Sequence, residues 1–369
     1  MKILIGADIV PTKPNINLFS GGDIEQIIGE SLKNKLEQAD FRVFNLEVPL
    51  TDKEAPIKKS GPNLVAPTSC IKGVKKLGVN LFTLANNHIM DHGVLGLSST
   101  IKVLNDNQIS YVGAGNNLSE ASKPYILEKD GLKIGIYVCV EHEFSIATEN
   151  FPGANPFDPL ESPDHITDLK KQCDYVIVLY HGGKEHYRYP SPDLQKICRK
   201  LCDKGADLVV CQHSHCIGCK EEYNGSVIVY GQGNFIFDKH NNEFWNSALL
   251  LEVDFSDTMT VNYIPLERDG RKIHKSENTS ILNNFEERSV QIKSPGFIEK
   301  KYTEFAVSML QGYLHTFCGV SKIYRIINKL CGKRLKKKIK EKRKLAMSNF
   351  IECEAHRELL LTGLKTPEK

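Results

Sequence analysis

Residues 207–215 have the sequence Asp-Leu-Val-Val-Cys-Gln-His-Ser-His. The apolar run at its centre is typical of a short buried β-strand, and two histidines follow at the point where the strand would end. A His-x-His pair in this position can direct both imidazoles around one turn, towards the same metal ion or towards adjacent ions. The segment therefore predicts a strand that presents metal ligands at its carboxyl end.

Similar apolar runs, rich in Val, Ile and Leu, alternate with stretches of helical periodicity along the preceding chain. The predicted strands are Ile3–Ala7, Phe41–Leu46, Asn80–Leu84, Ile134–Val140, Asp174–Tyr180 and Asp207–Cys211. The predicted helices are Ile24–Leu36, Ser69–Leu77, Leu97–Asn105 and Leu194–Cys202. This βαβ order, with nearly continuous apolar strands, predicts an α/β fold whose sheet is covered on both faces.

The pattern changes after Asn234. Two adjacent strand-like runs, Ser247–Phe255 and Met259–Pro265, predict an antiparallel hairpin at the flank of the sheet, which would make the sheet mixed. From about Asp269 the composition becomes polar. We therefore predict a domain of residues 1–270, a linker of residues 271–300 and a basic helical C-terminal extension of residues 301–369.

The composition is that of a folded protein, since 41% of the 369 residues are hydrophobic and 25% are charged. The formal net charge is only +3, so nucleic-acid binding is not expected. The 11 cysteines are an odd set scattered through apolar segments, which favours buried reduced thiols over a disulfide framework. The first apolar run meets Asp8 too early for a signal peptide, and we therefore expect a cytoplasmic protein.

Almost every principal strand ends in a residue that can bind a metal ion. These residues are Asp8, Asn45, Glu47, Asn86, Asn87, His88, His181, Glu185, His213 and His215. Singly, they have ordinary explanations, because a strand-terminal Asp often caps the next helix and paired Asn residues are common in turns. Their shared place at the carboxyl ends of strands, where α/β sheets bind ligands, favours one common site. Carboxylate, amide and imidazole together suit Mn, Fe or Zn.

Six motifs occur in the order found in a known family. They are Gly6-Ala7-Asp8, Asn45–Thr51, Leu84–Gly93 with Asn-Asn-His at its centre, His181–Glu185, Gly205–His215 and Tyr230–Phe235. Together they resemble the CapA (poly-γ-glutamate capsule biosynthesis) family of calcineurin-like metallophosphoesterases, over roughly residues 1–266. The resemblance implies two mixed β-sheets packed face to face with flanking helices, a metallophosphoesterase-like four-layer sandwich.

The resemblance also implies a metal site with an outer acid. The implied ligands are Asp8 and His215 for one ion, Asn87, His181 and His213 for the other, and Glu47 as a bridge. His88 would act as the acid and Asp91 would orient it, although capping of the next helix is an equal alternative for Asp91. Ordinary metallophosphoesterases carry a histidine where this chain has Val10, so the first ion would lose a nitrogen ligand. Either the site holds one divalent ion, or another group such as Asn45 replaces the lost ligand and the site holds two (Mn, Fe or Zn).

The neighbouring residues suggest an anionic small molecule or an acidic polymer as substrate. On the substrate side we expect Asn45, Glu185, Arg188 and Asn234. The guanidinium of Arg188 matches a carboxylate or phosphate, although an ordinary solvated loop is the alternative there. Our hypothesis is a metal-dependent hydrolase acting on a phosphoester or on an amide linkage of an acidic polymer. The rival hypothesis is a noncatalytic metal-binding assembly factor of a capsule polymer synthase complex.

The C-terminal extension has an apolar and a basic feature. A helical stripe of apolar residues comprises Phe305, Met309, Leu310, Tyr313, Leu314 and Phe317. Residues 333–340 are dense in Lys and Arg, with Leu335 and Ile339 one helical turn apart. A basic helix that faces solvent is the simplest interpretation, and peripheral contact with an anionic membrane is the alternative.

Overall fold

A computed structural model of the chain describes residues 1–237, 242–270, 272–317 and 341–352, together with the isolated helical residues 323, 326, 327, 330, 356, 357 and 364. The chain divides into two compact units, Met1–Tyr302 and Thr303–Lys369. The first unit contains every strand of the described chain and all the residues predicted for the metal site.

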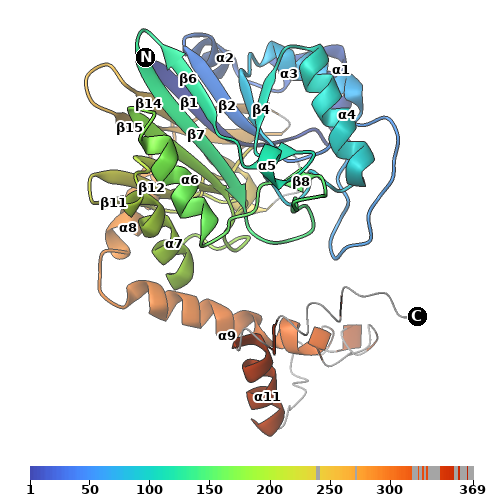
Figure 1. Cartoon of the computed structure of the whole chain (residues 1–369), viewed down its shortest axis with the longest axis vertical. Coiled ribbons are helices and arrows are strands. Elements are labelled where there is room, and N and C mark those ends of the chain that lie inside the picture. Colours follow the sequence, from blue (N-terminus) through green and yellow to red (C-terminus); the bar gives the residue numbers. More distant parts are fainter. Residues whose placement is uncertain are drawn as a thin grey trace. The chain divides into compact units, whose positions relative to one another are not determined.

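The larger sheet of the first unit has the strand order β16-β15-β14-β1-β2-β3-β4, and β13 pairs with β1 as well (Figure 1). Its strands are β1 (Lys2–Val10), β2 (Phe41–Leu46), β3 (Leu81–Thr83), β4 (Ser110–Val112), β13 (Asn234–Phe237), β14 (Ser247–Asp254), β15 (Thr260–Asp269) and β16 (Lys272–Lys275). Strand β1 is parallel to β2 and β13 but antiparallel to β14, so the sheet is mixed. The predicted hairpin is confirmed as β14 and β15.

The second sheet has the order β11-β12-β10-β9-β7-β6. Its strands are β6 (Tyr125–Lys129), β7 (Leu132–Val140), β9 (Tyr175–His181), β10 (Leu208–Gln212), β11 (Lys220–Tyr223) and β12 (Ser226–Tyr230). The four central strands are parallel and both edge strands are antiparallel, so this sheet is also mixed. A third, two-stranded sheet pairs β5 (Ala114–Gly115) with β8 (Gly153–Ala154).

The helices of the first unit are short and connect the strands. They are α1 (Ile16–Gly21), α2 (Glu30–Glu37), α3 (Ile71–Lys76), α4 (Gly93–Asp106), α5 (Leu118–Ala121), α6 (Glu161–Lys170), α7 (Pro192–Asp203) and α8 (Thr279–Gln291), with 3-10 turns η1 (Ile24–Gln26), η2 (Thr68–Cys70) and η3 (Glu243–Trp245). The predicted helix Ile24–Leu36 is interrupted at Gly29, where a side chain would meet Cβ of His274 at 2.8 Å. Only glycine fits this close approach of two segments.

Alternation along β9 shows how the layers pack. Ile177 and Leu179 belong to the core shared with the larger sheet, whereas Val176 and Val178 belong to a second cluster with α6 and α7. Successive side chains of a strand point to opposite faces, so one face of this sheet meets the other sheet and the opposite face meets helices. The two-sheet sandwich with flanking helices expected from the resemblance is therefore confirmed.

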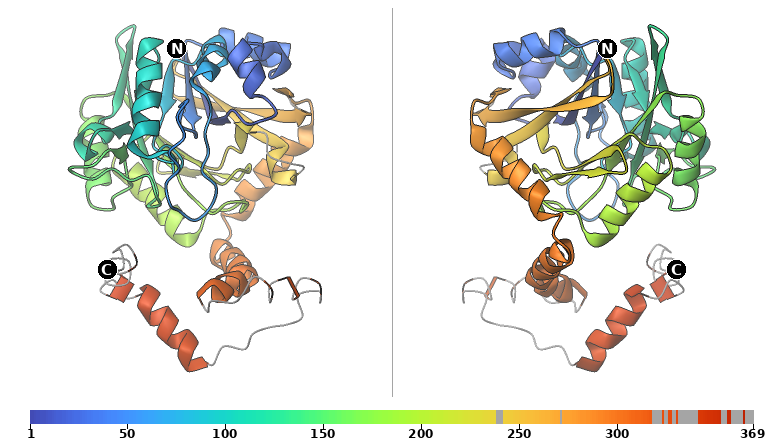
Figure 2. Two further views of the ribbon diagram at one scale, coloured as in Figure 1. Left: turned by 90° about the vertical axis from the view of Figure 1, so that its right-hand side faces the viewer. Right: turned by 90° about the vertical axis from the view of Figure 1, so that its left-hand side faces the viewer.

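The predicted linker of residues 271–300 needs correction, because the first compact unit extends to Tyr302. This stretch contains β16, α8 and the start of α9 (Phe297–Phe317), and α8 lies against the first unit in both views of Figure 2. Ile281, Phe285 and Ser289 of α8 are buried, and Ser289 Oγ accepts a hydrogen bond of 2.9 Å from the backbone of Lys220. The buried stripe of this helix consists of residues four positions apart within an otherwise polar sequence. The polar composition therefore suggested a linker instead of a packed helix.

A truncated chain that keeps the whole first unit is therefore expected to end after Tyr302, and a cut after Ser294, within the predicted linker, should weaken the core. Ile298 is buried in the second cluster, and the rings of Phe297 and Tyr189 lie 5.3 Å apart. A chain that ends at Ser294 loses both contacts and should be about 2–3 kcal/mol less stable than one that ends at Tyr302. Denaturant unfolding of the two truncated chains measures the difference, and equal stabilities would show that these contacts are unimportant.

The cysteines follow the prediction in the described part of the chain. Cys70, Cys139, Cys173, Cys198, Cys202, Cys211, Cys216 and Cys219 are all free and buried. Burial raises the pKa of Cys70 to about 11 and that of Cys202 to about 12. These two side chains are therefore neutral thiols at physiological pH, with little of the thiolate that reacts.

In the second unit the structure describes the remainder of α9 and helix α11 (Glu341–Glu352). The predicted apolar stripe falls within α9, which confirms its helical conformation. The basic run of residues 333–340 includes no described residue, so the interpretation given for it lies outside the described residues. No helix in the described chain is long and apolar enough to cross a membrane.

Candidate metal centre

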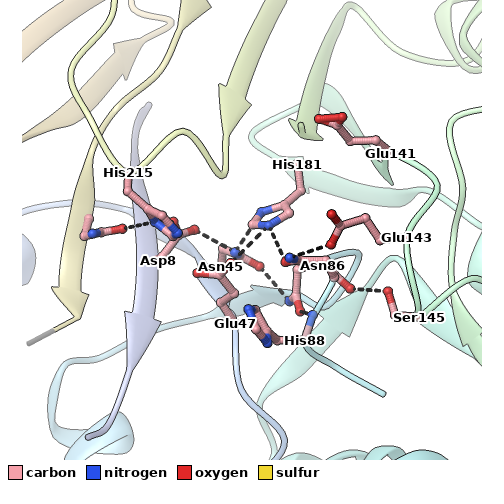
Figure 3. A network of polar contacts seen from close by, with 12 residues as sticks. Asp8, Asn45, Glu47, Asn86, His88, Glu141, Glu143, Ser145, His181 and His215 are labelled. Atoms are coloured by element: carbon pink, nitrogen blue, oxygen red, sulfur yellow. Dashed lines mark hydrogen bonds and ion pairs between the residues drawn. The ribbon is translucent and has the colours of Figure 1, made fainter. Parts of the chain in front are cut away.

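The predicted ligands come from both sheets and meet where parallel strands end, as Figure 3 shows for Asp8, Glu47, His181 and His215. Asp8 lies on β1, Glu47 immediately follows β2, and His181 is the last residue of β9. His213 and His215 follow β10, and Asn87 follows β3. All six side chains are buried. The carboxyl ends of parallel strands thus bring together residues that lie far apart in the sequence.

Two groups of side chains could each hold a metal ion. One group is Glu47, His181 and His213, and the other is Asp8, Glu47 and His215. Within each group one ligand atom per residue lies within 4.8 Å of the others. Glu47 belongs to both groups, as the resemblance implied for a bridging carboxylate. Carboxylate oxygen and imidazole nitrogen suit Zn, Mn or Fe.

Several ligand atoms in these groups have no hydrogen bond. Among the residues that the structure describes, both oxygens of Glu47, Oδ2 of Asp8 and Nδ1 of His213 are buried without a hydrogen-bond partner. Oε1 of Glu47 lies 3.2 Å from Nε2 of His181, but this approach does not have hydrogen-bond geometry. A buried charge without a partner is costly, and a bound cation removes that cost. The donor set therefore fits one or two divalent ions.

The protonation states of His213 and Asp8 suit metal binding, whereas His215 must first lose a proton. Burial lowers the pKa of His213 well below its ordinary value, and the charges of His181 and His215 act in the same direction, so the imidazole is neutral. Burial alone would raise the pKa of Asp8, but His215 and His181 outweigh it and lower this pKa, which favours the carboxylate. Burial likewise opposes protonation of His215, yet Asp8 and Glu47 raise its pKa to about 9. Metal binding at His215 would therefore release a proton.

Asn45 and Asn234, predicted on the substrate side, are buried behind the ligands. Nδ2 of Asn45 donates to Oδ1 of Asp8 at 2.7 Å and lies 3.2 Å from Nδ1 of His181. Oδ1 of Asn234 lies 2.8 Å from Nδ1 of His215. A proton on Nδ1 of His215 would point to Asn234 and leave Nε2 as the ligand atom. The two amides thus orient the ligands.

The turn that carries the histidine pair has unusual backbone geometry. His213 has φ 82° and His215 has φ 55°, both in the left-handed region. A residue other than glycine rarely adopts this conformation, and each instance costs of order 1–3 kcal/mol. The two rings lie 5.8 Å apart, and the ring of His181 lies 4.9 Å from that of His213. The rest of the fold therefore holds this turn in a strained form that directs both imidazoles inward.

The predicted acid, His88, is held by Asp91. Nδ1 of His88 lies 2.6 Å from Oδ2 of Asp91, which also accepts a hydrogen bond of 2.6 Å from the backbone of Leu64. The other oxygen of Asp91 forms a buried ion pair with Lys59. Helix α4 has no side-chain cap, so the alternative of a capping role for Asp91 does not apply. Asp91 instead fixes the ring of His88.

A pocket of about 260 Å³ lies over the metal groups. Its lining includes His88, Glu185 and His215, so the acid and one ligand face the same space. Arg188 is not part of this lining; its guanidinium lies 4.7 Å from the centre of the Phe244 ring. Two further residues of this lining, His186 and Trp245, were not predicted from the sequence, and neither was Lys59, which pairs with Asp91. His186 has φ 59° and accepts a hydrogen bond of 2.9 Å from the Trp245 indole.

Replacing Asp91 by Ala should destabilise the protein by about 3–5 kcal/mol, because it leaves the buried ammonium of Lys59 without its carboxylate. The matched double variant, Asp91→Leu with Lys59→Met, removes both charges and should recover much of this loss. Denaturant unfolding of the three proteins gives the free energies. If the double variant is no more stable than Asp91→Ala, the buried ion pair is not the cause.

The fold and the site define an α/β protein with a buried cluster of candidate metal ligands between two sheets. The sequence model described as "Bacterial capsule synthesis protein PGA_cap" matches residues 2–239. This chain belongs to that family.

Curated relatives support the same assignment. The chain is 33% identical over 216 residues to the PGA biosynthesis protein CapA of Bacillus subtilis, covering 58% of this chain and 57% of that protein. It is 30% identical over 241 residues to the capsule biosynthesis protein CapA of Bacillus anthracis, covering 63% and 59%. A probable polyglutamine synthesis accessory protein of Mycobacterium tuberculosis is 27% identical over 246 residues, covering 62% and 64%. The chain thus spans less than two thirds of the length of each relative.

Proposed function

We propose that this protein is a metal-dependent hydrolase of capsule polymer metabolism, which cleaves an amide linkage of polyglutamate or a phosphoester. The main support is Glu47, which belongs to both candidate metal groups and whose two carboxylate oxygens are buried without a hydrogen-bond partner in the described structure. Family membership and the names of the relatives support a role with an anionic capsule polymer.

The proposed roles follow from the contacts of each side chain. The two groups that share Glu47 would hold one or two divalent ions, and Asn87, whose Oδ1 lies 3.1 Å from Nε2 of His181, would be a further ligand. A bound ion would polarise the scissile carbonyl or phosphoryl group and lower the pKa of water. His88 would donate a proton from Nε2 to the leaving nitrogen or oxygen, since Nδ1 is held by Asp91.

The rival function is a noncatalytic metal-binding assembly factor. A purely structural metal centre has no need of a proton donor beside the ligands. Here His88 lies in the wall of the pocket that also reaches His215, and Asp91 and Lys59 support it from behind. This arrangement favours the enzyme over the assembly factor.

The test is hydrolysis by the full chain before and after metal removal. Poly-γ-glutamate is followed by the release of new amino groups, and a nitrophenyl phosphodiester by its chromophore. We expect cleavage of at least one substrate to disappear with chelation and to return with Mn, Fe or Zn. A metal-loaded, folded protein that cleaves neither would favour the assembly factor.

A further inference from the structure

A second pocket, which we call the arginine pocket, adjoins the one over the metal groups. It has a volume of about 460 Å³ and is lined by Arg188, from the loop between β9 and α7, and by Arg288 of α8. The segment of residues 242–246 separates the two pockets, since Asn242 and Trp245 line the first while Glu243 and Asn246 line the arginine pocket. A ligand would have to cross this segment to occupy both pockets.

The two guanidinium groups converge on one backbone carbonyl. Nη1 of Arg188 donates to the oxygen of Ile217 at 3.1 Å, and Nη2 of Arg288 donates to the same oxygen at 3.2 Å. Nε of Arg288 donates to the oxygen of Gly218 at 2.7 Å. These bonds use only part of the five N–H donors of each guanidinium and hold two like charges side by side.

No carboxylate neutralises this pair within the described chain: neither Arg188 nor Arg288 forms an ion pair there. Two glutamates, Glu243 and Glu267, also line the pocket, and Glu267 accepts a hydrogen bond of 2.9 Å from Ser276. Burial lowers the pKa of Arg288, and the charge of Arg188 adds to this effect. Adjacent, partly desolvated cations without a bound anion are unfavourable, so an oxyanion would relieve their repulsion.

Phe244 lies between the arginine pair and a residue of the pocket over the metal groups. Its ring stacks on His186, with centroids 5.2 Å apart, and Arg188 lies over the same ring at 4.7 Å. His186 lines the pocket over the metal groups. Arg288 lies beyond residues 2–239, which the family model matches, so this feature draws on a helix outside that region.

We propose that Arg188 and Arg288 form an oxyanion subsite that binds a carboxylate or phosphate group of the substrate, away from the reacting bond. The planar fork of arginine suits either group, and a pair of forks can hold one oxyanion from two sides. The assignment of this ligand to the substrate rests on the proposed function, whereas the binding of an oxyanion does not. A polymer of glutamate would supply such a carboxylate on the residue next to the one that reacts.

The experiment is calorimetric titration of the metal-loaded full chain with penta-γ-glutamate and, separately, with inorganic phosphate. Arg288→Gln should raise the dissociation constant of at least one probe by about tenfold or more, the usual effect of losing a charged hydrogen-bond donor. Lys293→Gln is the matched control, because it removes one positive charge from an exposed position just beyond the same helix and should change binding by less than about twofold.

Further variants separate the possible outcomes. Arg188→Gln should weaken binding as Arg288→Gln does, and it replaces Arg288→Gln as the test if that variant fails to fold. Arginine-dependent binding of the peptide supports a polymer carboxylate as the ligand, and arginine-dependent binding of phosphate alone supports a phosphate group. Unchanged binding of both probes by folded Arg188→Gln would overturn the subsite. Arginine-dependent binding by a protein without hydrolytic activity would retain the subsite and reject only the proposed reaction.

Discussion

Replacing Glu47 by Gln should remove most of the bound metal and, with it, the hydrolytic activity. Glu47 is the residue common to both ligand groups in the described structure, and neither of its oxygens has a hydrogen-bond partner there. Gln keeps the shape of the side chain but removes the negative charge that draws cations to the site. We expect a fall of at least about tenfold in metal affinity, measured by dialysis against buffered metal.

Glu185→Gln is the matched control for this variant. Glu185 lines the same pocket but belongs to neither ligand group, so its replacement should leave the metal content unchanged. If both variants retain the wild-type metal content, Glu47 is not a ligand.

Thermal unfolding provides a second measurement, because the direction in which a chelator should shift the unfolding temperature can be stated in advance. A chelator should lower the unfolding temperature of the wild type, because it removes a ligand of the folded state and leaves the buried oxygens of Glu47 without a partner that satisfies them. The same chelator should have little effect on Glu47→Gln, which has less metal to lose. Equal shifts in the two proteins would contradict the assignment of Glu47.

Replacing His88 by Ala should leave the metal in place but lower turnover by about 10²–10⁴, the usual contribution of a general acid. His88 belongs to neither ligand group, and its Nδ1 is held 2.6 Å from Asp91. The loss should be large for an amide or alkyl ester and smaller for a nitrophenyl ester, whose leaving group needs no proton. Turnover of both substrates by the metal-loaded variant is the measurement.

His142→Ala is the control, because His142 is exposed and belongs to neither ligand group. Its turnover should match that of the wild type. An equal loss for both substrates in His88→Ala would argue against proton donation, and a loss of metal would instead place His88 among the ligands.

The strands and the ligands could be predicted because each leaves a local mark in the sequence. Strand β2 has the predicted bounds Phe41–Leu46, and the two histidines that follow β10 belong to the two candidate ligand groups. A continuous apolar run that ends in His-x-His can be recognised in the sequence without knowledge of any contact between distant segments. The order of the motifs then indicated the two-sheet architecture, which the structure confirms.

Other features could not be predicted because they depend on contacts between distant segments. Helix α8 has only one buried stripe in a polar sequence, so its composition resembled a linker. Lys59 meets Asp91 across 32 positions in the sequence, and no local pattern marks either as a partner of the other. The role of Asn45 likewise appears only when Asp8 and His181 lie beside it. The sequence alone does not indicate which distant side chains will contact one another.

The proposed function requires that the cluster around Glu47 binds metal. The most direct test is elemental analysis of the wild-type chain, purified without chelators and without a metal-affinity tag. We predict about one or two equivalents of Mn, Fe or Zn per folded chain, in keeping with the two ligand groups that share Glu47. A folded wild-type protein that contains none of these metals, and takes up none on dialysis against them, would contradict this account.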